Sequence, residues 1–263
     1  MGGRTAARRW ADELAAWAID PAILAAAPES PHGFPAALWA AQRSADGPAR
    51  TIQAAREGLP VGGTVLDIGC GGGAGSIPLA DIARRLVGVD ESEQMLETYE
   101  AAAAETPVPD VATVRGTWPD VAPLVETADV VVAANVVYNV PDIVPFVLAA
   151  HERASHRVVV ELTVAHPQIG ISPLWRHFHG QERPNGPRLA DFVMVLAEIG
   201  IRPVIWRWDR QPTLQTTDPV AYAAWVRRRL CLPYEREPEV AALLARQPLG
   251  PIPVATVWWD TEA

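Results

Sequence analysis

One stretch of the sequence decides the fold: Val65-Leu66-Asp67-Ile68-Gly69-Cys70-Gly71-Gly72-Gly73-Ala74-Gly75. An apolar run typical of a strand ends next to an acidic residue and is followed at once by glycines. Glycines at 69, 71 and 73 let the backbone turn sharply and come close to a ligand, where a Cβ would collide. The next residues, 76–83, are predicted to begin a helix whose free N–H groups point at that ligand.

A second strand, residues 86–89, ends at another acidic residue, Asp90. Asp90 lies 90 − 71 = 19 residues after Gly71. This is about the separation at which an acidic residue meets a ribose in a nucleotide-binding strand–helix–strand unit. The two motifs together predict a cofactor that contains adenosine.

The position of Asp67 indicates which kind of cofactor binds. A dinucleotide site accepts a pyrophosphate at its glycine loop, and a carboxylate two residues before the first glycine would put negative charge beside it. A cationic ligand suits this position better. The alternative is that Asp67 and Asp90 are only a turn residue and a helix cap, which two motifs in register disfavour.

The pattern Asp67-x-Gly69-x-Gly71-x-Gly73, followed by Val89-Asp90-Glu91-Ser92-x-x-Met95-Leu96, resembles the class I S-adenosylmethionine-dependent methyltransferases of small-molecule type. The resemblance runs from about residue 60 to residue 163. It implies S-adenosylmethionine as the cofactor. In that family the glycine loop (here Asp67, Gly69, Gly71 and Gly73) borders the methionine part of the cofactor. Asp90, with Glu91 beside it, would bind the ribose, and Met95 would pack near the adenine.

The chain departs from the family after its third strand. Many family members carry an acidic residue there, which recognises the adenine amino group. This sequence has Gly116-Thr117-Trp118 instead. We expect Thr117 or the local backbone to replace that contact, with Trp118 against the adenine ring.

Strand and helix patterns alternate along the whole chain, which predicts an α/β fold with a doubly wound sheet. The expected strands are 65–68, 86–89, 111–115, 129–134, 157–162, 202–208 and 254–259. The resemblance implies seven mostly parallel strands, with the last one antiparallel beside the fifth. We predict one domain over 1–263: a helical N-terminal extension (1–59, with helices at 10–17, 21–27, 35–43 and 49–57), a cofactor-binding core (60–164), and a substrate-side half (165–263) with a helical insertion before the last strand.

The acceptor side is predicted at the end of the fourth strand, where open α/β sheets bind ligands. The run Asn135-Val136-Val137-Tyr138-Asn139-Val140 resembles the Leu-His-His-Val-Pro-Asp run of small-molecule methyltransferases. It fits the Asn-Pro-Pro-Tyr motif of enzymes acting on planar amino groups less well, because both prolines are missing. We expect Asn135 near the cofactor and Tyr138 near the substrate, with a buried core tyrosine as the alternative.

Candidate general bases follow the fifth strand. His177 and His179 lie in a loop that also carries His166, and the unperturbed pKa of histidine is near neutrality. A surface or structural role is the alternative for each of them. Glu161, at the end of the fifth strand, faces either the pocket or the sheet edge. No metal site is predicted, and the two cysteines, Cys70 and Cys231, do not indicate a disulfide scaffold.

Composition narrows the function class further. The net charge is −9, which opposes the phosphate-driven affinity of nucleic-acid binders. No segment has the length and apolarity of a secretion signal or a membrane span, so we expect a cytoplasmic protein. The basic residues are all arginine, which with abundant Ala, Gly, Pro and Val is typical of a GC-rich bacterial coding sequence.

The sequence therefore predicts an enzyme that transfers a methyl group from S-adenosylmethionine to a small molecule by direct displacement. A nicotinamide-dependent oxidoreductase on a similar fold is one rival, and Asp67 counts against it. A non-catalytic cofactor-binding sensor or scaffold is another, because binding motifs do not demonstrate turnover. The acceptor, the methylated atom type and the oligomeric state stay open.

Overall fold

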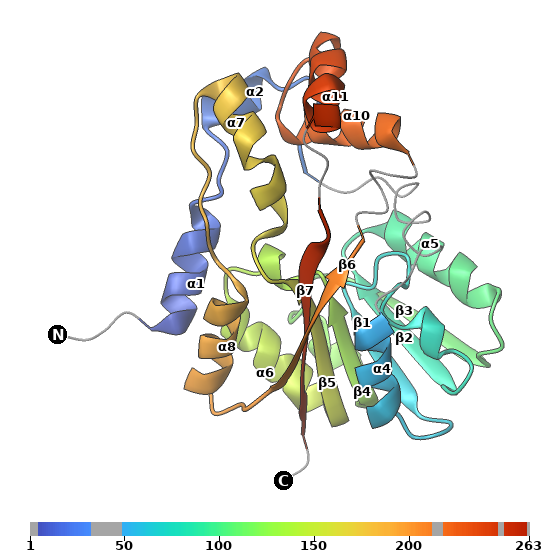
Figure 1. Cartoon of the computed structure of the whole chain (residues 1–263). Coiled ribbons are helices and arrows are strands. Elements are labelled where there is room, and N and C mark those ends of the chain that lie inside the picture. Colours follow the sequence, from blue (N-terminus) through green and yellow to red (C-terminus); the bar gives the residue numbers. More distant parts are fainter. Residues whose placement is uncertain (1–4, 33–48, 212–217, 247–249, 262–263) are drawn as a thin grey trace.

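The computed structural model describes residues 5–32, 49–211, 218–246 and 250–261. The helix predicted over 35–43 lies outside the described residues. Within these ranges the chain builds a seven-stranded sheet with helices on both faces. A further group of helices lies above the ends of the strands (Figure 1).

The sheet has the strand order β3-β2-β1-β4-β5-β7-β6. Strands β1 to β5 are parallel, whereas β7 is antiparallel to both β5 and β6 and lies between them. This confirms the predicted doubly wound α/β fold with an antiparallel last strand. The strands are β1 (Thr64–Ile68), β2 (Arg85–Asp90), β3 (Asp110–Arg115), β4 (Ala128–Ala134), β5 (Ala154–Thr163), β6 (Val204–Arg210) and β7 (Ile252–Asp260).

Two separate cores cover the two faces of the sheet. Leu66 and Ile68 of β1 pack in one core, and Val65 packs in the other, because successive side chains of a strand point to opposite faces. The helices of the first face are α1 (Ala6–Ala15), α6 (Ile143–Arg153) and α8 (Leu189–Glu198), and those of the second are α4 (Ala49–Gly58) and α5 (Glu93–Ala104) (Figure 1).

Four helices form a cap above the carboxyl ends of the parallel strands (Figure 1). They are α2 (Pro21–Ala26), α7 (Ser172–His179), α10 (Pro219–Arg229) and α11 (Glu237–Arg246), and they enclose a third apolar core. The helices α10 and α11 are the predicted insertion before the last strand, and α1 and α2 belong to the predicted N-terminal extension. None of the described helices has the length and apolarity that a membrane span requires.

The helix predicted directly after the glycines is wrong in its extent. Only a three-residue 3₁₀ turn, Ile77–Leu79, forms there. The nine residues 76–84 must return along a strand of five or six residues, which is about 17–20 Å long. An α-helix of nine residues rises only about 13 Å, so the chain uses looser turns with a larger rise per residue.

Candidate active site

The glycine loop after β1 has a backbone that glycine adopts most readily. Gly69, Gly71 and Gly73 have φ values of +66°, +49° and +87°, in the region that a Cβ disfavours. A Cβ on Gly69 would also lie 2.3 Å from Cγ1 of Val136. Because Val136 comes just after β4, the glycine lets the ends of β1 and β4 approach each other closely.

Asp90, the last residue of β2, holds this loop through its carboxylate. Its Oδ2 accepts a hydrogen bond from the Gly71 N–H at 3.0 Å, and its Oδ1 accepts one from the Ser92 N–H at 2.9 Å. The side chain is half-buried. An ionised carboxylate has about four acceptor positions, so Asp90 retains capacity for hydroxyl donors of a ligand.

Asp67 lies beneath the same loop and is 1% exposed. Its Oδ2 accepts a hydrogen bond from the Ser76 hydroxyl at 2.6 Å, and that hydroxyl lies 3.0 Å from the Tyr99 hydroxyl of α5. Burial raises the pKa of Asp67 to about 7, the Ser76 hydrogen bond opposes this rise, and the charge of Asp90 adds to it. Two carboxylates thus flank the loop, one below it and one beside it.

The residues predicted to bind the adenosine part of the cofactor, apart from Asp90, are divided between the surface and the core. Glu91 and Thr117 are exposed, and Met95 is buried in the first turn of α5, where the Ser92 side chain caps the helix. Trp118 is buried in the core on the α1, α6 and α8 face, and its Nε1 donates to the Phe146 carbonyl at 3.1 Å. The contact of Glu91 with the ribose and the contacts of Met95, Thr117 and Trp118 with the adenine stay predictions. The burial of Trp118 in the core does not favour its contact with the adenine.

Asn135 lies directly after β4 and has a left-handed backbone, with φ of +60°. Its backbone N–H donates to the Glu161 carbonyl at 2.9 Å, and its Nδ2 donates to the Glu161 Oε1 at 2.8 Å. The conformation is uncommon for a residue other than glycine, and these two hydrogen bonds hold it. Asn135 therefore lies between the glycine loop on β1 and the carboxylate on β5.

Glu161 is the centre of a buried polar network that sequence reasoning did not resolve. Its carboxylate is 0% exposed. Its Oε2 accepts from the Thr51 hydroxyl of α4 at 2.7 Å, and its Oε1 also accepts from Nη1 of Arg210 at 3.0 Å. The Thr51 hydroxyl lies 2.9 Å from that of Thr256 on β7. The one signal in the sequence is an acidic residue within the otherwise apolar run 158–162.

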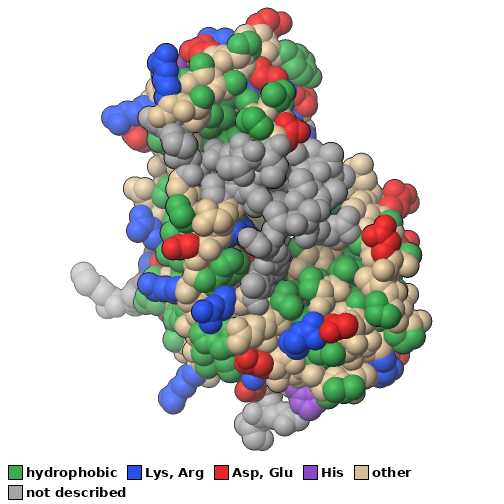
Figure 2. Space-filling view, turned by 45° about the vertical axis from the view of Figure 1, so that its right-hand side comes forward, with side chains coloured by type: hydrophobic (Ala, Val, Ile, Leu, Met, Phe, Trp, Pro, Cys, Tyr) green, Lys and Arg blue, Asp and Glu red, His purple; other side chains and the backbone are tan. Residues whose placement is uncertain are grey.

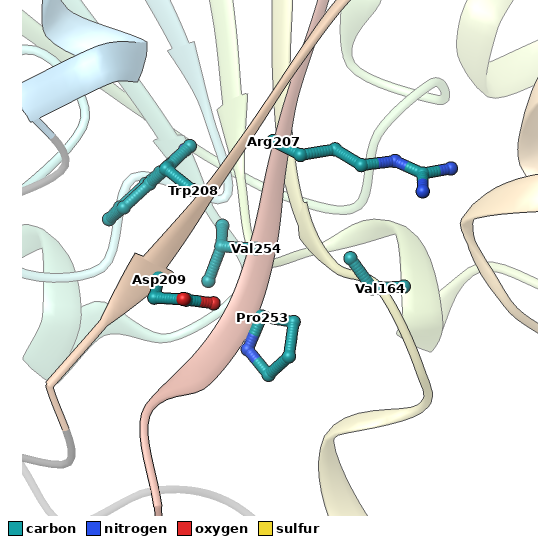
Figure 3. A pocket seen from close by; sticks show the side chains of 6 residues that line it. All are labelled: Val164, Arg207, Trp208, Asp209, Pro253 and Val254. Atoms are coloured by element: carbon teal, nitrogen blue, oxygen red, sulfur yellow. The ribbon is translucent and has the colours of Figure 1, made fainter.

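A hollow of about 290 Å³ opens at this edge of the sheet, beyond the end of β5. Figure 3 shows the Arg207 guanidinium on the side of β7 where Val164 lies, and Trp208 on the other side. The hollow is lined by both apolar and charged side chains, which are those of Val164, Arg207, Trp208, Asp209, Pro253 and Val254. A small molecule with an apolar body and a polar group fits walls of this kind.

Tyr138 is packed into the core near this edge and is 6% exposed. Its hydroxyl donates to the Thr163 carbonyl at 2.7 Å, and its ring stacks on Trp10 with the centroids 5.5 Å apart. Burial raises the pKa of Tyr138 above its ordinary value. This geometry fits the alternative that Tyr138 is a buried core tyrosine. A catalytic role for Tyr138 stays a prediction.

The two predicted histidine bases lie in the cap. Nε2 of His177 is 3.1 Å from Glu239 on α11, and Nε2 of His179 donates to the Leu230 carbonyl at 2.7 Å. These contacts do not bring either ring to the glycine loop or to Asn135. The catalytic role of His177 and His179 stays a prediction that this arrangement does not favour.

The segment predicted as a loop is largely helical, since α7 spans Ser172–His179, and His166 lies before that helix and closer to the sheet. Its ring stacks on Trp17 at a centroid distance of 3.8 Å, and it lies edge-on to Tyr138 at 5.3 Å. Burial, followed by the charges of Arg183 and Arg229, lowers its pKa to about 4. The imidazole is therefore neutral at physiological pH, and its Nδ1 accepts from the Gln168 N–H at 3.3 Å.

Comparison with known proteins identifies the central part of the chain. Residues 65–155 match a family model described as a methyltransferase domain. A ubiquinone biosynthesis O-methyltransferase from Methylobacterium is 40% identical over 87 residues, which are 33% of this chain and 34% of that protein. The chain thus spans about a third of the length of the curated relatives it matches.

Solved structures agree with this chain over more of its length. A cyclopropane-fatty-acyl-phospholipid synthase-like protein from Lactobacillus casei superposes with a TM-score of 0.58 at 17% identity, covering 90% of this chain and 97% of that one. Magnesium protoporphyrin IX methyltransferase from Synechocystis, solved with bound SAH, gives 0.51 at 20% identity, covering 66% and 78%. Residues 65–155 therefore match the methyltransferase-domain family, and the chain has the fold of the class I S-adenosylmethionine-dependent methyltransferases.

Proposed function

We propose that this protein is an S-adenosylmethionine-dependent methyltransferase that acts on a small molecule. The observation that carries the proposal is a glycine loop bordered by two carboxylates, Asp67 below and Asp90 beside it. The cofactor supplies a methyl group on a sulfonium, which is a good leaving group because of its positive charge. The task of the protein is then to align the acceptor with that methyl group and to exclude water.

The residues present fit this cofactor. The unused acceptor positions of Asp90 suit the two ribose hydroxyls, and the Cβ-free backbone at Gly69, Gly71 and Gly73 lets a ligand approach. The buried carboxylate of Asp67 suits a cationic group in the methionine part. We propose Met95, with Glu91 and Thr117, for the adenosine end and Asn135 for the end that faces the acceptor.

The acceptor side is built from the ends of β4 and β5 and from the cap. We propose that the acceptor enters from the hollow beside Val164, which lies one residue beyond β5. The negative net charge disfavours a nucleic acid as the acceptor. Figure 2 shows acidic and basic side chains interspersed over the described part of one face, which suits a small acceptor better than a polyanion.

A general base is needed most when the methylated atom is a hydroxyl oxygen or a carbon, and least when it is a neutral amine. The described residues around Asn135 offer Glu161, but its carboxylate is engaged by Asn135, Thr51 and Arg210. We therefore propose catalysis mainly by alignment and do not assign a base. The name of the curated relative specifies oxygen methylation for that relative, and its match covers too little of it to extend the acceptor to this chain.

The strand order of the sheet disfavours one of the two rivals. A nicotinamide-dependent oxidoreductase on the dinucleotide-binding fold has the strand order 3-2-1-4-5-6, whereas here the antiparallel β7 is inserted beside β5. A non-catalytic sensor would share the cofactor loop, so only turnover separates it from an enzyme.

Turnover is tested with S-adenosylmethionine labelled with ¹³C in the methyl group. The purified protein is incubated with a panel of hydroxylated and amino-substituted small molecules, and mass spectrometry detects the labelled product. Label transfer that is lost in Asp90→Ala supports the proposal. Cofactor binding with no label transfer to any acceptor class supports a sensor, and binding of NAD⁺ alone contradicts both.

A further inference from the structure

We infer that Asp67 makes the cofactor site selective for charge, so that the sulfonium cofactor binds more tightly than its thioether product, S-adenosylhomocysteine. The inference rests on the proposed function and adds a specificity-determining residue to it. Methyl transfer removes the positive charge of the sulfur, and the site then holds the product less strongly. Asp67 would thus favour exchange of spent cofactor for fresh cofactor.

The side chain of Asp67 points to the α4 and α5 face of the sheet and lies directly under the glycine loop. A Cβ placed on Gly75 would lie 3.2 Å from Oδ1 of Asp67. Oδ2 accepts the Ser76 hydroxyl, whereas Oδ1 accepts no hydrogen bond from any described residue. Its charge is therefore close to the ligand-facing backbone and is only partly compensated.

The described groups around Asp67 leave its charge without a cationic partner. The groups that face it are Asp90 from β2, Ser76 and Cys70 from the loop, and Tyr99 from α5. None of these is a cation, and in the described ranges no arginine or histidine forms an ion pair with Asp67 or Asp90. A buried carboxylate without a cationic partner is unfavourable, and a cationic ligand would relieve that cost.

Glu161 provides a comparison within the same protein. Its side chain points to the same face of the sheet as that of Asp67. Asp67 pairs with Val132 and Val132 pairs with Val159, so Glu161 lies two residues nearer the carboxyl end of β5 than the position level with Asp67. Its carboxylate, however, is paired with Arg210 at 3.0 Å. Of these two buried carboxylates, only Asp67 is left to interact with a ligand charge.

S-adenosylmethionine and S-adenosylhomocysteine are well suited to measuring the effect of the Asp67 charge on binding. They share the adenine, the ribose and the amino-acid group, and they differ in one methyl group and one positive charge. The ratio of their dissociation constants therefore cancels the shared contacts. An unscreened unit charge within about 8 Å at an effective dielectric of about 20 changes binding by roughly tenfold or more.

The preference for S-adenosylmethionine over S-adenosylhomocysteine should increase as the pH rises. The pKa of Asp67 is raised to about 7 by burial, so the carboxylate becomes charged as the pH rises through neutrality. Burial also raises the pKa values of Cys70 and Tyr99, which keeps both neutral in that range. The preference for the sulfonium must then increase between about pH 6 and about pH 8.

Calorimetric titrations of the full chain with each ligand at these two pH values test the inference. Wild type should gain roughly tenfold in the preference for S-adenosylmethionine at the higher pH, and Asp67→Asn should show a low, constant ratio. The matched control is Asp129→Asn, which removes a carboxylate that accepts from Thr64 at the opposite end of β1. This control should behave like wild type.

A pH-independent ratio in wild type would overturn the inference, and so would an Asp67→Asn variant that keeps the wild-type preference. If that variant does not fold, the wild-type pH profile alone decides. Folded wild type that binds neither ligand would instead overturn the proposed function, so the two failures are distinguishable.

Discussion

Asn135 and Glu161 are joined twice, by a backbone hydrogen bond of 2.9 Å and by a side-chain hydrogen bond of 2.8 Å from Nδ2 to Oε1. Because an ionised carboxylate only accepts hydrogen bonds, the amide must turn its NH₂ group toward Glu161. Its Oδ1 then faces away from that carboxylate. The orientation of the Asn135 amide is thus set by a residue on the neighbouring strand.

Replacement of Glu161 should be among the costliest changes at this edge. Glu161→Ala leaves Arg210, Thr51 and Asn135 without their shared acceptor. We expect a loss of about 3 kcal/mol in the free energy of unfolding. This value is at the low end for a broken buried ion pair because Arg210 is partly exposed. Thr51→Val removes the hydroxyl that contacts both Glu161 and Thr256 and should cost about 1–2 kcal/mol. Urea unfolding measures both, and equal costs would contradict a central role for the carboxylate.

Gly69 should tolerate no side chain. Gly69→Ala adds a Cβ 2.3 Å from Val136 at a φ of +66°, and we expect cofactor affinity to fall by at least about tenfold because the loop must move. The matched control is Gly200→Ala, with a φ of +84° and nothing within 4 Å of the added Cβ. It carries the same kind of backbone strain, about 1 kcal/mol, and should keep wild-type affinity. If both variants bind the cofactor like wild type, the loop is not the binding element.

Tyr138→Phe separates a structural from a catalytic tyrosine. The change removes the hydroxyl that donates to the Thr163 carbonyl at 2.7 Å, so we expect a loss of about 1–2 kcal/mol in the free energy of unfolding. Once the variant is folded, the rate of label transfer should stay within about threefold of wild type. A fall of more than about a hundredfold with unchanged stability would identify Tyr138 as catalytic.

Asp67 should make the stability of the ligand-free protein depend on pH. Its pKa is about 7 in the folded state and about 4 in the unfolded chain. The folded state therefore holds the proton more tightly between these values, and the stability from this group is present below about pH 4 and lost as the pH rises through about 7. The free energy of unfolding of Asp67→Asn, compared with that of wild type at the same pH, should therefore increase as the pH rises, by up to about 4 kcal/mol. Unfolding curves of the two proteins that stay parallel across this range would show that Asp67 titrates normally.

The sequence was sufficient for the parts of the fold that depend on local pattern. The strand at residues 65–68, the glycines and Asp90 are local signals, and the strands and helices lie close to their predicted positions. The helix expected at 76–83 was wrong because glycine and proline content does not report the distance that the returning chain must cover. Whether a helix fits there depends on the length of the neighbouring strands.

The acceptor side could not be predicted in the same way, because its contacts join distant parts of the chain. Thr51 and Glu161 are 110 residues apart, and Arg210 is 49 residues beyond Glu161. No local pattern records that these side chains meet at one carboxylate. The histidines 177 and 179 illustrate the converse: their residue type suits a base, but α7 carries them to the cap, where Glu239 and the Leu230 carbonyl engage them.

A calorimetric titration decides whether the glycine loop and Asp90 bind S-adenosylmethionine. Wild type and Asp90→Ala are titrated with S-adenosylmethionine, S-adenosylhomocysteine and NAD⁺. We expect the first two to bind wild type at one site and NAD⁺ not to bind. Asp90→Ala should weaken both by about tenfold or more, because hydrogen bonds to a charged acceptor are lost. Binding of NAD⁺ alone, or S-adenosylmethionine affinity that is unchanged in folded Asp90→Ala, would contradict this expectation.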